Sequence, residues 1–70
     1  MIAEEWIRAN LPVVFDGDED IIDWGNNVYT PIRAFLSMFE NIVQNALDRN
    51  QDVRQAIRDN DNGRGFAGLV

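Results

Sequence analysis

The pattern that most constrains this chain is an apolar heptad seam that runs from position 31 to about position 59. Its members recur at alternating spacings of four and three residues. They are Ile32, Leu36, Phe39, Val43, Ala46, Asn50, Val53 and Ile57. Such spacing is typical of a helix that packs against other helices. We therefore predict one long helix over residues 31–59, and every seam residue except Ala46 is a candidate contact with a partner.

The length of this helix conflicts with the length of the chain. An unbroken helix over residues 31–59 would be about 43 Å long at 1.5 Å per residue. A compact domain of 70 residues has a diameter of about 28 Å, from a radius of gyration of about 11 Å. Either the helix breaks near Asn50 and folds back, with Asp52 available to cap a final helix, or a second chain covers the overhang. In the second case Asn50 is a buried polar residue that fixes the register of the chains.

A first short helix is predicted over residues 2–10. It places Trp6 on the side that faces the core. Leu11-Pro12 ends it, because the residue before a proline avoids the helical region. The apolar run at residues 13–15 has no evident second strand to pair with, so we interpret it as a connector that packs on the core.

A second short helix is predicted after a turn at residues 16–18. Asp18 is placed to cap this helix, and Trp24 lies on its buried side together with two isoleucines. Gly25 supplies the left-handed residue that ends it.

The start of the long helix is marked by Thr30 and Pro31. Threonine is a good N-cap, and proline suits the first helical position. The predicted fold is therefore all-α, a small helical bundle with two short helices and one long helix, either continuous or broken. We predict a single helical domain over residues 1–60 and a glycine-rich tail over residues 61–70, flexible or docked.

The net charge of −6 comes from the first thirty residues. These hold seven acidic residues and one arginine, whereas residues 31–70 hold five of each sign. The predicted acidic face consists of Asp16, Asp18, Glu19, Asp20 and Asp23. Because phosphate binding needs a clustered basic surface, we expect no direct nucleic-acid binding.

The residue types present exclude several kinds of chemistry. The chain has no histidine, cysteine or lysine, which removes imidazole bases, thiolate nucleophiles, Schiff-base lysines and the usual zinc ligands. The acids from Asp16 to Asp20 resemble the start of a calcium loop, but that pattern needs glycine in place of Ile21 and glutamate in place of Asn27. We predict no enzyme activity, no catalytic residue, no metal, no cofactor and no small-molecule substrate.

The glycine-rich tail carries apolar residues that a purely flexible end would not need. They are Phe66, Leu69 and Val70. We predict that these three residues dock in a groove on a partner or on a neighbouring subunit.

These features predict a non-catalytic protein-protein interaction or assembly component, which self-associates or joins a larger complex such as a phage-like particle. The alternative is a small acidic inhibitor that mimics nucleic acid and blocks the basic groove of an enzyme, since the charge is so unevenly placed. Binding by a mimic should weaken steeply with salt, and assembly through an apolar seam should not. The acidic start predicts no signal peptide, and the apolar runs are too short for a membrane span. We therefore expect the protein in the cytoplasm or within an assembled particle.

Overall fold

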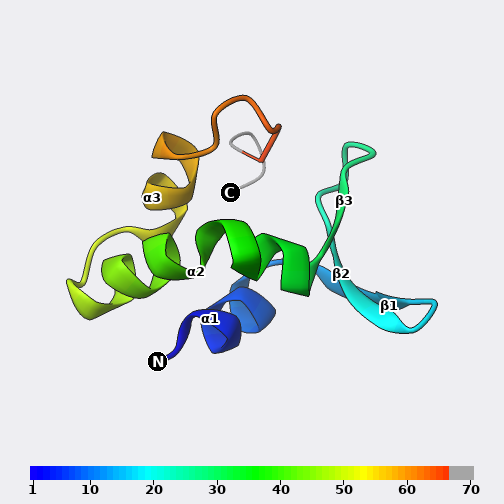
Figure 1. The fold of residues 1–70 in the computed structure, drawn as a ribbon, viewed down its shortest axis with the longest axis horizontal. Helices are drawn as coiled ribbons and strands as arrows, with labels where there is room; N and C mark the ends of the chain where they lie inside the picture. The colour runs from blue at the N-terminus through cyan, green and yellow to red at the C-terminus, as the bar shows by residue number, and fades with distance from the viewer. Residues whose placement is uncertain (67–70) are drawn as a thin grey trace.

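The chain folds into a small antiparallel sheet with its helices to one side, as Figure 1 shows. The computed structural model describes residues 1–66. The elements of this part, in chain order, are α1 (Ala3–Asn10), β1 (Val13–Asp16), β2 (Glu19–Asp23), β3 (Tyr29–Pro31), α2 (Ile32–Asp48) and α3 (Val53–Asp59). This is an α+β arrangement, so the predictions of an all-α fold and of a helical bundle are wrong.

A β-hairpin of β1 and β2 replaces the predicted connector and second short helix. Val13 pairs with Ile22, and Asp16 pairs with Glu19 on either side of a two-residue turn. Gly17 takes the first turn position with a φ of 64°, where type II′ hairpin turns need a glycine. A helix is predicted because two successive acids, Glu19 and Asp20, are favourable in the first turn of a helix. The prediction is wrong because the apolar runs on either side of the turn pair with each other, which makes this segment a strand.

A third strand, β3, pairs with β2 and leads directly into α2. Ile22 lies opposite Thr30, and the Thr30 hydroxyl accepts a hydrogen bond of 3.2 Å from the buried Trp24 indole N–H. The N-cap of α2 is Pro31, which makes no side-chain cap, so the prediction of Thr30 as N-cap is wrong. The reason is that a buried indole N–H needs an acceptor, and this hydroxyl supplies it.

The predicted long helix breaks at residues 49–52, which separate α2 from α3. Asn50 turns the chain with a φ of 54°, a left-handed conformation that asparagine tolerates better than most residues. The Asp52 side chain caps α3 by accepting a hydrogen bond of 3.2 Å from the Gln55 N–H. A continuous helix over residues 31–59 is therefore wrong, and the broken alternative resolves the length conflict. At 17 residues, α2 is about 26 Å long, which fits within the 35 Å longest dimension of the molecule.

The core lies between the three helices and the inner face of the sheet. Its buried apolar residues are Ala3, Ile7, Leu11, Ile22, Trp24, Ile32, Phe35, Phe39, Val43, Ala46, Val53, Ile57 and Phe66. Phe66 stacks on Trp24 with 4.7 Å between the ring centroids. It also packs edge-on against Phe35 and Phe39, at 5.7 and 5.8 Å. The segment that follows α3 therefore closes the core, and the packed unit includes Phe66.

Candidate functional site

The two faces of the sheet differ in what covers them. Residues that lie directly opposite each other in a ladder point to the same side of the sheet, so Val13, Ile22 and Thr30 share one face. This is the inner face, since Ile22 is 0% exposed and Thr30 is 8% exposed. The opposite side, which we call the outer sheet face, carries Val14, Ile21, Tyr29 and Pro31.

The outer sheet face is apolar and, within residues 1–66, partly exposed to solvent: Val14 and Tyr29 are exposed, and Ile21 and Pro31 are half-buried. Val14 lies opposite Ile21, and Ile21 lies opposite Pro31, so these residues form a row across the three strands. Beside the row, Tyr29 is 61% exposed, and Val14 is 44% exposed. Contiguous apolar surface on a folded domain marks interaction sites, and tyrosine is enriched at the centre of protein interfaces.

Carboxylates border the outer sheet face. Those on its side of the strands are Asp16, Glu19 and Asp23. Glu19 forms an ion pair of 3.1 Å with Arg33 in the first turn of α2. Asp23 accepts a hydrogen bond of 2.9 Å from the Gly25 N–H, which holds the loop between β2 and β3. The border is therefore negative along the hairpin and carries one arginine where α2 begins.

The fold divides the predicted acidic face between the two sides of the sheet. Asp20 points to the inner side and pairs with Arg8 of α1 at 2.6 Å, and Arg8 also pairs with Glu4 at 3.0 Å. The hydrogen bond to Asp20, and then that to Glu4, raises the pKa of Arg8 above its ordinary value. Within residues 1–66, Asp16, Asp18 and Asp23 form no ion pair, so the uncompensated charge of the predicted acidic face lies at the hairpin turn and at the other end of β2.

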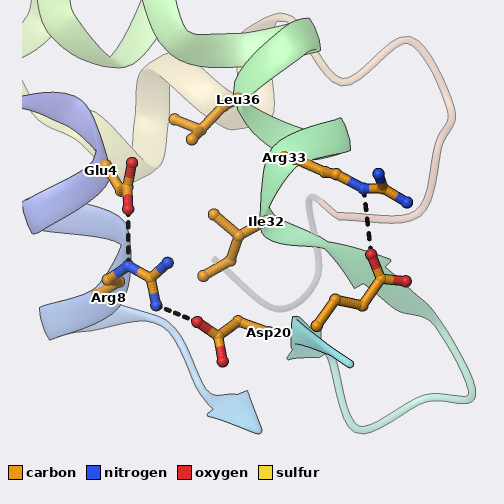
Figure 2. A pocket seen from close by; sticks show the side chains of 7 residues that line it. Glu4, Arg8, Asp20, Ile32, Arg33 and Leu36 are labelled. Atoms are coloured by element: carbon orange, nitrogen blue, oxygen red, sulfur yellow. Dashed lines mark hydrogen bonds and ion pairs between the residues drawn. The ribbon is translucent and has the colours of Figure 1, made fainter. Parts of the chain in front are cut away.

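A pocket of about 260 Å³ lies beside these ion pairs, between α1, β2 and the first turns of α2 (Figure 2). Ile32 and Leu36 form its apolar part, and Arg8 reaches towards them from α1, whereas the Arg33 guanidinium points away from Arg8 to its ion pair with Glu19. Both guanidinium groups are already bound to carboxylates. The volume is below the roughly 300–1,000 Å³ of small-molecule sites, so the pocket suits one side chain of a partner better than a substrate.

The surface of residues 1–66 can bind a partner by burying apolar side chains and by forming ion pairs. Among residues 1–66, no group of three or more histidine, cysteine, aspartate or glutamate side chains is placed to hold a metal ion. No helix in that part of the chain combines the length and apolar character needed to cross a bilayer.

The structure places most of the predicted seam inside the chain itself. The buried seam contacts are Ile32, Phe39, Val43, Val53 and Ile57. Leu36 is half-buried, and Asn50 is exposed at the turn between α2 and α3. Packing of α2 and α3 against the rest of the chain accounts for the heptad spacing. Contact of these residues with a partner stays a prediction.

The predicted tail site is described only as far as Phe66. This residue is 4% exposed and packs inside its own chain, against the aromatic residues of the core. Leu69 and Val70 lie outside the described residues. Docking of the tail on a partner stays a prediction.

Sequence reasoning does not find the outer sheet face, although a signal for it exists. Two apolar runs, residues 13–15 and residues 21–22, flank the dipeptide Gly17-Asp18, which is typical of two-residue hairpin turns. Pairing the two runs across this turn places Val14 opposite Ile21. Tyr29 has no comparable signal, because nothing in its immediate sequence shows that it joins a third strand.

Comparison with known proteins does not add to this description. The chain matches no protein-family model, no curated protein and no solved structure. Its function is therefore argued from the geometry and chemistry of its own surface.

Proposed function

We propose that this chain is a non-catalytic protein-interaction component that binds a protein partner through the outer sheet face. The observation that carries the proposal is the partly exposed apolar row of Val14, Ile21 and Pro31, with the exposed Tyr29 beside it. Removing such a surface from water is the main driving force of protein association. A three-stranded sheet also presents these residues from a paired backbone, so little flexibility is lost when a partner covers them.

The charges around the outer sheet face specify the kind of partner. Asp16, Glu19 and Asp23 surround the apolar row, and Arg33 balances only Glu19. A complementary surface has an apolar centre with lysine or arginine residues at its edge. Rim charges of this kind mainly orient the partner and raise the association rate, while the apolar row supplies most of the affinity.

The alternative prediction, an inhibitor that mimics nucleic acid, has less support. A mimic needs a dense array of free carboxylates, but arginines neutralise Glu19 and Asp20. Uncovered apolar residues such as Tyr29 have no counterpart in a phosphate backbone. The remaining acids are better explained as the border of an apolar interface.

Site-specific photocrosslinking in the cells that produce the protein tests the proposal. A photoreactive phenylalanine analogue at Tyr29 reports what covers the outer sheet face. The matched control places the same analogue at Glu40, an exposed position on α2. We expect a discrete protein adduct from position 29 and none, or only diffuse products, from position 40.

A second variant shows whether the apolar row carries the binding. Val14 is 44% exposed, so Val14→Asp places a charge within the row without unfolding the sheet. This variant should abolish the adduct from position 29. The proposal fails if position 29 gives no protein adduct, or if positions 29 and 40 give the same products.

A further inference from the structure

The edge of the sheet formed by β1 is a second surface that no other part of the described chain pairs with. Within residues 1–66 the strand order is β1-β2-β3, so in this part of the chain β1 pairs only with β2 and its other edge is free. Figure 1 shows the hairpin that contains β1 projecting away from the helices. Phe15 in this strand is 73% exposed, although it shares the inner side of the sheet with Val13. An exposed edge strand with apolar side chains is a template for pairing with another strand.

The register shows which backbone groups point to the free edge. In an antiparallel ladder, hydrogen-bonded positions alternate along each strand. The Pro12 carbonyl accepts a hydrogen bond of 2.8 Å from the Asp23 N–H, so Pro12 faces β2. Val14 and Asp16 then also face β2, and the N–H and C=O groups of Val13 and Phe15 face outward.

This edge is complementary to itself. When two copies pair antiparallel with Val14 on the two-fold axis, Val13 of each copy lies opposite Phe15 of the other. All outward N–H and C=O groups of these two residues are then paired, and two contacts form between an aromatic and a β-branched side chain, which stabilise antiparallel strands. A register with Phe15 on the axis places Val13 opposite Gly17 and Val14 opposite Asp16, so it loses both of these contacts.

The charges at the two ends of this pairing are also complementary. The antiparallel arrangement directs the hairpin turn of each copy towards Pro12 and Asn10 of the other. The Arg54 guanidinium lies at that end, where it donates a hydrogen bond of 3.2 Å to the Asn10 carbonyl, and within residues 1–66 no carboxylate forms an ion pair with it. Asp16 and Asp18 at the turn lack such a pair as well.

We infer that the free edge of β1 binds β1 of a second copy of this chain, which gives a symmetric dimer with a continuous six-stranded sheet. The occupant is a second copy because both the outward backbone groups and the unpaired charges match across the two-fold axis. The contact is short, so we expect a reversible dimer at high protein concentration. It uses the edge rather than the outer sheet face and goes beyond the proposed function.

Absolute mass by analytical ultracentrifugation over a concentration series, up to about millimolar because weak association has a Kd in that range, is the first test. A reversible rise from the 8.0 kDa monomer to twice that mass is expected. Phe15→Pro and Phe15→Val form a matched pair, because both remove the ring and only proline removes the outward N–H. Since this N–H does not face β2, the hairpin should keep its pairing in both variants. We expect the proline variant to dissociate about tenfold or more readily than the valine variant.

Disulfide trapping tests the register without depending on the stability of the proline variant. The chain has no cysteine, so a single introduced thiol can react only with its copy. Val14→Cys places two thiols across the two-fold axis at a non-hydrogen-bonded pair, where the Cα atoms are about 4.5 Å apart and a disulfide can form. Tyr29→Cys is the control, because it is exposed but lies on the far strand. Rapid covalent dimerisation of the first variant alone is expected.

The inference is overturned if the chain stays monomeric throughout the series, or if it associates equally with valine and proline at position 15. Equal trapping from positions 14 and 29 would overturn it as well. Its failure is separate from that of the proposed function. If the chain is monomeric and still gives a partner adduct from position 29, only the dimer inference fails. If the chain forms the dimer but gives no such adduct, only the proposed partner binding fails.

Discussion

The aromatic residue that closes the core, Phe66, gives the most decisive test of the fold. Its ring is 4% exposed and stacks on Trp24 at 4.7 Å, with Phe35 and Phe39 at its edges. Phe66→Ala removes this ring and leaves the three other rings in place. Residues 60–66 then have no apolar side chain buried in the core, and Trp24 becomes accessible to water.

The expected cost follows from the burial of the ring. Replacing a core phenylalanine with alanine costs about 3–5 kcal/mol. Because Phe66 lies on a segment that can leave the core without displacing a helix, we expect about 3 kcal/mol, at the lower end. At about 0.05–0.15 kcal/mol per residue, a chain of 70 residues has only about 4–10 kcal/mol of unfolding free energy. The variant therefore loses a large fraction of its stability.

Urea unfolding followed by Trp24 fluorescence, in a Trp6→Phe background, measures this loss. With a urea dependence of about 1–2 kcal/mol per molar, the midpoint should fall by about 2 M, and the native emission should shift to longer wavelength. Phe15→Ala is the control at dilute, monomeric concentration, because that ring is 73% exposed. Its effect should stay below about 0.5 kcal/mol. Equal midpoints for the two variants would refute the docking of Phe66.

Paired substitutions at three further positions test the local interactions that set the fold, each by the same urea assay. Asp52→Ala should cost about 1 kcal/mol because it removes the cap of α3, and Asp52→Ser should restore most of it; no difference between them would contradict the cap. Asn50→Gly should be neutral or stabilising and Asn50→Ala destabilising by about 1 kcal/mol, because the φ of 54° is left-handed. The reverse order would contradict that conformation. Thr30→Val should cost about 1–3 kcal/mol, since it leaves the buried Trp24 indole N–H without an acceptor, whereas Thr30→Ser should cost less. An unfolding free energy that is the same for valine and serine would show that the hydroxyl is not needed.

The parts of the fold that sequence predicts are those fixed by local chemistry. The apolar spacing after position 31 predicts the face of α2 that is buried, and Asp52 predicts where a new helix can start. Chain length adds the physical reason for the break, because an unbroken helix is longer than the domain. These signals depend on neighbouring residues or on size, and neither requires knowledge of the sheet.

The sheet could not be found in the same way, because its evidence is divided between distant positions. Glu19 and Asp20 are poor strand residues and good helix-start residues, and their ion pairs with Arg33 and Arg8 exist only in the folded chain. Tyr29 has an exposed ring only because β3 pairs with β2 in a register that turns it outward. The candidate site depends on that register, so the local sequence does not predict the site any more than it predicts the strands.

The position of Phe66 in the chain also determines when folding can finish during synthesis. Phe66 follows Trp24 by 42 positions, and a ribosome adds about 5–20 residues per second, so the ring that covers the indole is made about 2–8 s later. The hairpin and α1 contain mostly local contacts and can form as they emerge, but the aromatic core cannot close in that interval. The nascent chain therefore cannot cover Trp24, Phe35 and Phe39 with the Phe66 ring until Phe66 has left the exit tunnel. Chaperones that recognise aromatic segments have their opportunity to bind in this window.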